Sequence, residues 1–163
     1  MKKQFETPIL MLIFNRPDTT QMVFNQIKKV KPKYLYISAD GPRDGNKSDE
    51  ILCKKTREII KQIDWDCNVQ TNFIDKNLGC RLAPPTGITW FFKSVEQGII
   101  LEDDCLPDIS FFCYCEELLN KYKNNRDIFI ISGDNFLFNK IKISDSYYFT
   151  RLVHIWGWAS WRR

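Results

Sequence analysis

Residues that usually build structural metal sites are scarce in this sequence. It has one histidine among 163 residues, and its six cysteines contain no CxxC pair. The spacing of a structural zinc site is therefore missing. We expect reduced thiols that serve as small core residues in a cytoplasmic protein.

Long apolar runs and concentrated charge are also missing. The apolar run 9–14 stops at Asn15, Arg16 and Pro17, too early to cross a membrane. Any membrane association would therefore have to be peripheral. The net charge of +4 comes from basic residues spread among acidic ones, whereas nucleic-acid binding usually needs a concentrated basic face. We expect no nucleic-acid partner.

Segments of strand length alternate with amphipathic segments along a chain of about one domain. Strands are predicted at 8–14, 34–39, 68–73, 99–101 and 127–132. Helices are predicted at 19–30, 48–63, 88–96 and about 110–122, the last with Ser110 as its N-cap. Pro84 and Pro85 fit a turn or the first position of a helix. This order predicts a single α/β domain, 1–163, with a mostly parallel central sheet covered on both faces.

The segment 98–105, GIILEDDC, carries the clearest functional signal. Its apolar strand would release Glu102, Asp103 and Asp104 together at its carboxyl end. Three like charges there need a cation, and Mg²⁺ or Mn²⁺ typically binds one or two carboxylates plus the phosphates of a substrate. The pattern suggests a nucleotide site, with a solvated acidic turn as the alternative.

Two other predicted strand ends carry polar residues, namely Asn15 with Arg16 and Asp40 with Gly41. Ligands of parallel sheets bind outside the carboxyl ends of the strands, so these residues should share a crevice with the acidic triplet. The chain has no GxxxxGK[ST] loop and no dinucleotide fingerprint after its first strand. A metal and an arginine would have to hold the phosphates. Turn chemistry alone could also explain Asp40 and Gly41.

Five segments in this order resemble the sequence blocks of bacterial GT-A glycosyltransferases, relatives of the N-acetylglucosaminyltransferase I group (families 2 and 13). They are FNRP (14–17), SADGP (38–42), NLGCR (77–81), LEDDCLP (101–107) and WGWASWRR (156–163). The resemblance implies a Rossmann-like nucleotide-diphospho-sugar transferase sandwich. It also implies metal-dependent transfer of a sugar from a UDP-sugar to a hydroxyl of a glycan or other acceptor.

The resemblance implies a role for each strand-end residue. Asp104 would coordinate Mn²⁺ or Mg²⁺, which offsets charge on the departing nucleoside diphosphate. Asp103 would approach the ribose or sugar hydroxyls, and Glu102 would hydrogen-bond the sugar. Asp40 would accept a hydrogen bond from uracil, and Arg16 would lie beside the base or diphosphate.

The remaining implied donor contacts are less specific. They are Asn15, Gly41, Arg81, Trp156, Gly157 and Trp158. Arg81 could equally be a surface ion-pair partner. Trp156 and Trp158 could form an aromatic core cluster with Trp161 instead of stacking on a sugar.

The carboxyl-terminal end departs from the family pattern. In the resembling proteins the general base follows the tryptophan block, whereas this sequence ends at Arg163. We therefore expect a truncated chain without the acceptor-binding portion, in which Asp134 is a weak candidate for the base. Uncovered tryptophans would form an apolar patch that favours a homodimer.

Two other functions remain open at this point. A sugar-phosphate nucleotidyltransferase would use the same metal and crevice, although such enzymes generally carry a glycine-rich basic loop after the first strand, and FNRP does not provide one. A catalytically inactive nucleotide-sugar-binding module is the third possibility.

Overall fold

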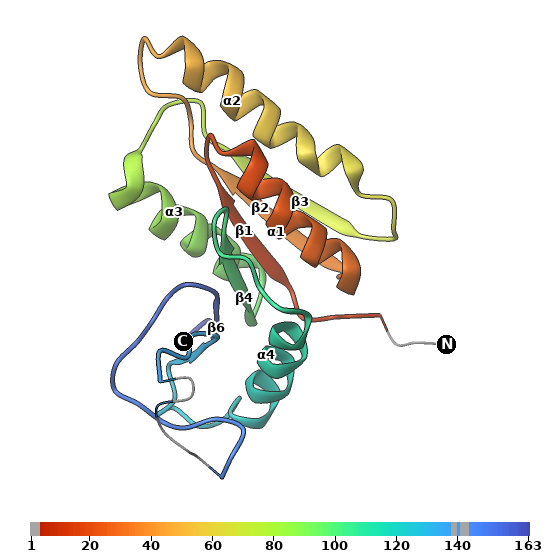
Figure 1. Ribbon diagram of the computed structural model, residues 1–163, viewed down its shortest axis with the longest axis vertical. Helices are drawn as coiled ribbons and strands as arrows, with labels where there is room; N and C mark the ends of the chain where they lie inside the picture. The colour runs from red at the N-terminus through yellow and green to blue at the C-terminus, as the bar shows by residue number, and fades with distance from the viewer. Residues whose placement is uncertain (1–3, 138–139, 141–143) are drawn as a thin grey trace.

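A six-stranded sheet organises the computed structural model, which describes residues 4–137, 140 and 144–163 (Figure 1). The strand order is β3-β2-β1-β4-β6-β5. The strands are β1 (Ile9–Ile13), β2 (Tyr34–Ala39), β3 (Asn68–Phe73), β4 (Gln97–Glu102), β5 (Ile130–Ser132) and β6 (Trp158–Trp161). From β3 to β4 all neighbours are parallel, and β6 runs antiparallel to both β4 and β5. The predicted α/β fold with a mostly parallel sheet is confirmed.

Helices cover both faces of the sheet. They are α1 (Pro17–Val30), α2 (Lys47–Glu58) with its 3₁₀ continuation η1 (Ile59–Gln62), α3 (Gly79–Ser94) and α4 (Ile109–Lys121). α3 packs against one face, while α1, η1 and α4 pack against the other. Among the described residues, no helix combines the length and apolar character needed to cross a bilayer.

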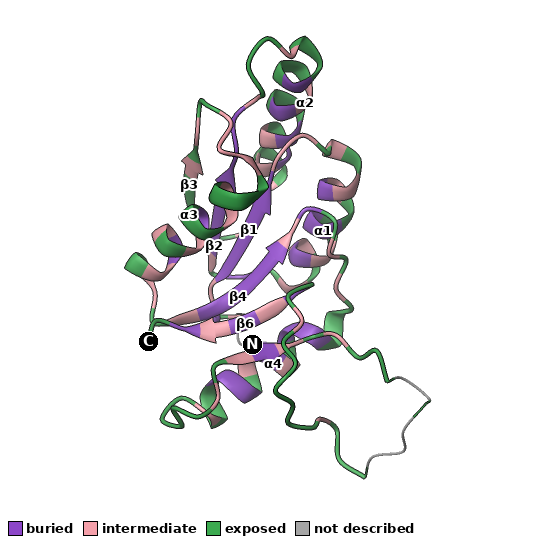
Figure 2. Cartoon of the chain, turned by 90° about the vertical axis from the view of Figure 1, so that its left-hand side faces the viewer, coloured by how far each residue is buried: buried purple, intermediate pink, exposed green. Residues whose placement is uncertain are grey.

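The apolar run of β1 explains its central position. All five of its residues are buried, and alternate side chains leave a strand on opposite faces. Leu10 and Leu12 join the core under α3, whereas Ile9, Met11 and Ile13 join the core under α1 and α4. Figure 2 shows β1, β2 and β4 almost wholly buried, as expected for parallel strands covered on both sides.

Helix boundaries differ from the sequence prediction in two places. α3 begins at Gly79 rather than Ile88 and contains Pro84 and Pro85. The start of α3 is instead fixed by Asp40, which accepts hydrogen bonds from the amides of Leu78 and Gly79, and each proline removes one backbone donor within the helix. The N-cap of α4 is Asp108 rather than Ser110, since Asp108 Oδ1 accepts hydrogen bonds from the Ser110 amide (2.9 Å) and hydroxyl (2.6 Å).

β6 was not predicted as a strand. Its sequence, WASW, has no β-branched residue and only four positions. Its pairing depends on contacts distant in sequence, since Trp161 pairs with Gln97 and Trp158 pairs with both Ile100 and Ser132. A local pattern carries no information about such partners.

Candidate functional site

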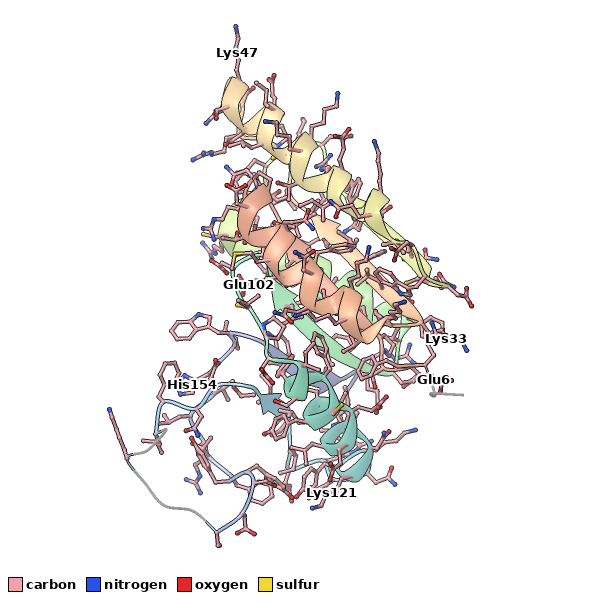
Figure 3. All side chains as sticks on the ribbon, turned by 45° about the vertical axis from the view of Figure 1, so that its right-hand side comes forward. Glu6, Lys33, Lys47, Glu102, Lys121 and His154 are labelled. Atoms are coloured by element: carbon pink, nitrogen blue, oxygen red, sulfur yellow. The ribbon has the colours of Figure 1, made fainter. Side chains whose placement is uncertain are left out.

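The strand-end residues lie at one edge of the sheet. β1 is parallel to both of its neighbours, β2 and β4, so the carboxyl ends of the three strands emerge together. Segments 14–16, 40–41 and 102–104 follow or close these strands. Figure 3 places Glu102 at this end of the sheet, close to the beginning of α1. The predicted gathering of three strand ends is therefore present, although their side chains have different partners.

Arg16 connects the ends of β1 and β4. Its Nη1 contacts Asp104 Oδ2 and lies 3.5 Å from Asp103 Oδ1. The amide of Phe14 donates to Asp103 Oδ2 at 3.2 Å. The guanidinium of Arg16 is thus one cation beside the acidic triplet, and binding of Mg²⁺ or Mn²⁺ there stays a prediction.

The three acidic side chains do not converge on one point. Glu102 pairs in register with Leu12 on the face covered by α3, whereas Asp103 turns toward Phe14 and Arg16 on the other face. Burial is the largest factor that raises the pKa of both Glu102 and Asp103; Arg16 acts in the opposite direction on both.

The acidic residues fit a metal bound jointly with a substrate better than a metal cage. In the part of the chain that the structure describes, no three His, Cys, Asp or Glu residues are grouped as potential ligands. Asp103 and Asp104 nevertheless both approach one cationic nitrogen. Mg²⁺ commonly binds in this way, through one or two carboxylates completed by phosphate oxygens. The donor set is therefore suitable for Mg²⁺ or Mn²⁺ that arrives with a nucleotide.

Asp40 fastens the beginning of α3 to the end of β2. The buried carboxylate accepts hydrogen bonds from the amides of Gly41 (2.9 Å), Leu78 (2.8 Å) and Gly79 (3.0 Å), and from Asn77 Nδ2 (2.9 Å). The negative charge also lies favourably at the amino end of a helix. Both carboxylate oxygens are thus engaged within the chain. Uracil recognition by Asp40 stays a prediction, and a base would have to share these oxygens.

Close packing of two backbone segments requires glycine at position 41. A Cβ atom at this position would lie 2.6 Å from the backbone carbons and oxygen of Asp75 and Lys76. Only a residue without a side chain permits this approach of two backbones. Gly41 therefore keeps the loop before α3 close to the end of β2.

Asn15 belongs to a network that sequence reasoning missed. Its Nδ2 donates to Asp49 Oδ1 (2.8 Å), and Asp49 also accepts from Arg43 Nε (2.5 Å) and Nη2 (2.9 Å). Asp49 is buried in the first turn of α2, where its amide donates to the N-cap residue Asn46 (3.1 Å). The sequence signal was the spacing of Asn46 and Asp49, which is typical of a capped helix start.

We expect an Asp49→Asn variant to be less stable than the original chain, by a margin that depends on pH. The pKa of Asp49 lies below its ordinary value, chiefly because the Arg43 side chain donates to it. Its stabilising contribution is therefore fully present above the unfolded-state pKa of about 4 and is lost as pH falls toward the folded-state pKa. Urea unfolding at pH 7, 5, 4 and 3 should give a constant difference at the higher values and a narrowing one below pH 4. A difference that does not change with pH would contradict the assigned ion pair.

A large cavity adjoins the acidic turn. Its volume is about 1460 Å³, and it lies between α4, β5, residues 104–108 and residues 134–137 and 146–157. Of the predicted site residues it brings together Asp104, Asp134, Trp156 and Gly157. The other walls are rich in aromatic side chains: Phe111, Tyr114, Tyr122, Tyr147 and Phe149. Its size would admit a sugar together with part of an acceptor.

Asp134 and Gly157 make hydrogen bonds that join residues 133–134 to residues 156–157 in the wall of this cavity. Asp134 Oδ2 accepts from the Trp156 amide (3.2 Å), and the Gly157 carbonyl accepts from the Gly133 amide (3.0 Å). Gly157 has a φ of 87°, a left-handed conformation that favours glycine. Asp134 thus braces the segment before β6 and lines the same cavity as Asp104.

The three tryptophans do not form the expected single cluster. Trp158 packs in the core under α3, whereas Trp161 is buried in the other core and donates from Nε1 to the Leu119 carbonyl (3.2 Å). Trp156 is 62% exposed and contacts Phe136 edge-on. The separation arises because β6 sends its tryptophans to opposite faces of the sheet. The predicted uncovered patch is wrong for Trp158 and Trp161.

Arg81 and Trp158 are predicted donor contacts that do not line the large cavity. Arg81 is exposed in the first turn of α3, close in sequence to the loop that Asp40 holds. Trp158 does not line the large cavity, whereas its neighbour Gly157 does. Donor contacts by these two residues stay predictions.

Comparison with known proteins shows a likeness to solved structures. No family model and no curated protein matches the sequence. Among solved structures, the 4-diphosphocytidyl-2C-methyl-D-erythritol synthase from Anaerococcus prevotii is similar, with a TM-score of 0.52 and 12% identity over 96% of this chain and 72% of that chain. At this identity the likeness concerns the fold. It supports a fold of the nucleotide-sugar transferase type and gives no support to placement in the N-acetylglucosaminyltransferase I group.

Proposed function

We propose that this chain is a metal-dependent glycosyltransferase that binds a UDP-sugar at the carboxyl edge of β1, β2 and β4. The observation that carries the proposal is the contact of Arg16 with Asp103 and Asp104. This contact brings a guanidinium and two carboxylates to one point, which supports binding of a diphosphate together with a divalent ion.

The side chains at this edge have separate roles in the proposal. Asp104, with Asp103 beside it, would hold Mn²⁺ or Mg²⁺, and the bound ion would offset charge on the nucleoside diphosphate that departs. Arg16 binds diphosphate oxygens. Glu102 is half-buried on the α3 face and orients the sugar. Asp134 faces the cavity that Asp104 also lines, and it is our candidate for the base that removes the proton of the acceptor hydroxyl.

A nucleotidyltransferase is the second candidate, and the comparison of folds favours it. The similar structure is an enzyme of the nucleotidyltransferase type. Such an enzyme would join a nucleoside triphosphate to a sugar phosphate and release pyrophosphate. Against it stands the connection from β1 to α1, which consists of residues 14–16 and contains no glycine. So short a connection offers few backbone amides to a triphosphate.

Calorimetric titration with UDP tests the binding site. We expect MnCl₂ to raise the affinity for UDP at least tenfold, about 1.4 kcal/mol, because the metal neutralises charge between the diphosphate and the carboxylates. Equal affinity with and without Mn²⁺, or no binding at all, would overturn the proposal of a metal-dependent UDP-sugar site.

Product analysis separates the two reactions. The chain is incubated with MnCl₂ and either UDP-sugars plus hydroxyl acceptors or UTP and CTP plus sugar 1-phosphates. Release of UDP from a UDP-sugar supports glycosyl transfer. Release of pyrophosphate from a triphosphate supports nucleotidyl transfer and would overturn our first choice. Binding of UDP without either product would identify a nucleotide-sugar-binding module instead.

A further inference from the structure

The cation position at the end of β4 is already filled by a side chain of the protein. A single nitrogen, Arg16 Nη1, contacts Asp104 and lies within 3.5 Å of Asp103. The Asp103 side chain is only 10% exposed, whereas those of Arg16 and Asp104 are 56% and 49% exposed. The ion pair is thus enclosed on the Asp103 side and open to solvent on the Arg16 side.

A divalent ion and the guanidinium cannot occupy this position together. Both are attracted to the same carboxylate oxygens, and cations about 4 Å apart repel each other strongly wherever water is partly excluded. Binding of metal at Asp104 therefore requires Arg16 to leave. The exposed side of the ion pair gives the guanidinium a direction in which to move.

The backbone of Arg16 is held in place, so only its side chain can make this movement. Its carbonyl accepts from the Thr20 amide (3.0 Å), and Pro17 occupies the first turn of α1. Proline at this position fixes the backbone in the helical conformation. The guanidinium can therefore rotate away from Asp104 while its Cα stays at the edge of the nucleotide site.

We propose that Arg16 is a built-in counter-ion that a divalent metal displaces only when a nucleoside diphosphate arrives with it. This inference rests on the proposed function. A metal ion alone would break the ion pair without replacing it, so it would bind weakly. A metal–diphosphate complex supplies new anionic oxygens for the released guanidinium. The planar fork of guanidinium donors matches the geometry of phosphate oxygens. Metal and nucleotide binding are consequently coupled, and each strengthens the other.

The experiment measures Mn²⁺ binding in the absence and presence of UDP. Free Mn²⁺ is followed by its electron paramagnetic resonance signal in the original chain and in Arg16→Gln, Arg16→Lys and Arg126→Gln variants. Arg126 is exposed in the turn after α4 and controls for the loss of one positive charge. Urea unfolding confirms that each variant is folded.

Without UDP, we expect Arg16→Gln to bind Mn²⁺ at least tenfold more tightly than the original chain, and Arg16→Lys and Arg126→Gln to remain within about threefold of it. Addition of UDP should raise the Mn²⁺ affinity of each protein, and the factor by which it rises should be at least tenfold smaller for Arg16→Gln than for the original chain. Unchanged Mn²⁺ affinity of Arg16→Gln, in a protein that binds UDP with Mn²⁺, would overturn the counter-ion inference and leave the proposed function intact. Failure of the original chain to bind UDP with Mn²⁺ would instead overturn the proposed function, whatever Arg16→Gln does with the metal alone.

Discussion

An Asp104→Asn variant should lose about 100-fold or more of the Mn²⁺-dependent turnover of the original chain. Asp104 is half-exposed at the end of β4 and lines the large cavity, so it can reach a metal without supporting the core. A bound metal contributes several kcal/mol of charge stabilisation during transfer, and each 1.36 kcal/mol changes the rate tenfold. Asparagine keeps the shape of the side chain and removes its charge. The measurement is UDP or pyrophosphate release under saturating MnCl₂.

Asp66→Asn is the matched control for this variant. Asp66 is an exposed aspartate that precedes β3, at the opposite edge of the sheet, and its replacement should leave turnover unchanged. Both variants should unfold at the same urea concentration as the original chain. Full Mn²⁺-dependent activity in Asp104→Asn would show that the metal binds elsewhere.

An Asp40→Ala variant should lose at least about 3 kcal/mol of unfolding free energy. Its carboxylate is buried and satisfies three backbone amides and the side chain of Asn77. Hydrogen bonds to a charged group contribute about 1.5–3 kcal/mol each, and donors left without a partner add their desolvation cost. Urea unfolding measures the loss. Hydrogen exchange should also accelerate at the amides of Leu78 and Gly79, where the carboxylate now holds the start of α3.

Asp75→Ala gives the comparison for Asp40→Ala. Asp75 is exposed in the loop between β3 and α3, and surface changes of this kind usually alter stability by less than about 0.5 kcal/mol. Similar stability of the two variants would refute the anchoring role of Asp40. If Asp40 also recognises uracil, Asp40→Asn should reduce a preference for UDP over CDP, because a carboxylate accepts from the ring N–H that uracil has and cytosine lacks.

The sheet could be predicted because its information is local. β2 and β3 coincide with the predicted strands 34–39 and 68–73, and β1 lies within the predicted strand 8–14. Strand ends in a parallel sheet share an edge by geometry, so the neighbourhood of Arg16 and the acidic triplet followed from element order alone. The ion pairs within that neighbourhood could not be predicted from element order.

Side-chain partners could not be predicted because they are set by three-dimensional packing. The contact of Arg16 with Asp104 joins side chains 88 positions apart in sequence. Asn15 bonds to Asp49, which no strand-end rule indicates. The first residues of α3, a helix that also contains two prolines, are anchored by Asp40, which follows β2. In each case the partner lies in a distant segment, and the local sequence pattern does not identify it.

The insertion of β6 between β4 and β5 determines the order in which the sheet can assemble during translation. Within the described chain, β5 pairs only with β6, so residues 130–132 are synthesised before their strand partner exists. Until residue 161 follows, β4 presents an unpaired edge of buried, apolar sequence. Open edges of this kind pair readily with other chains. A nascent chain paused between residues 133 and 157 would therefore be the form most dependent on a chaperone.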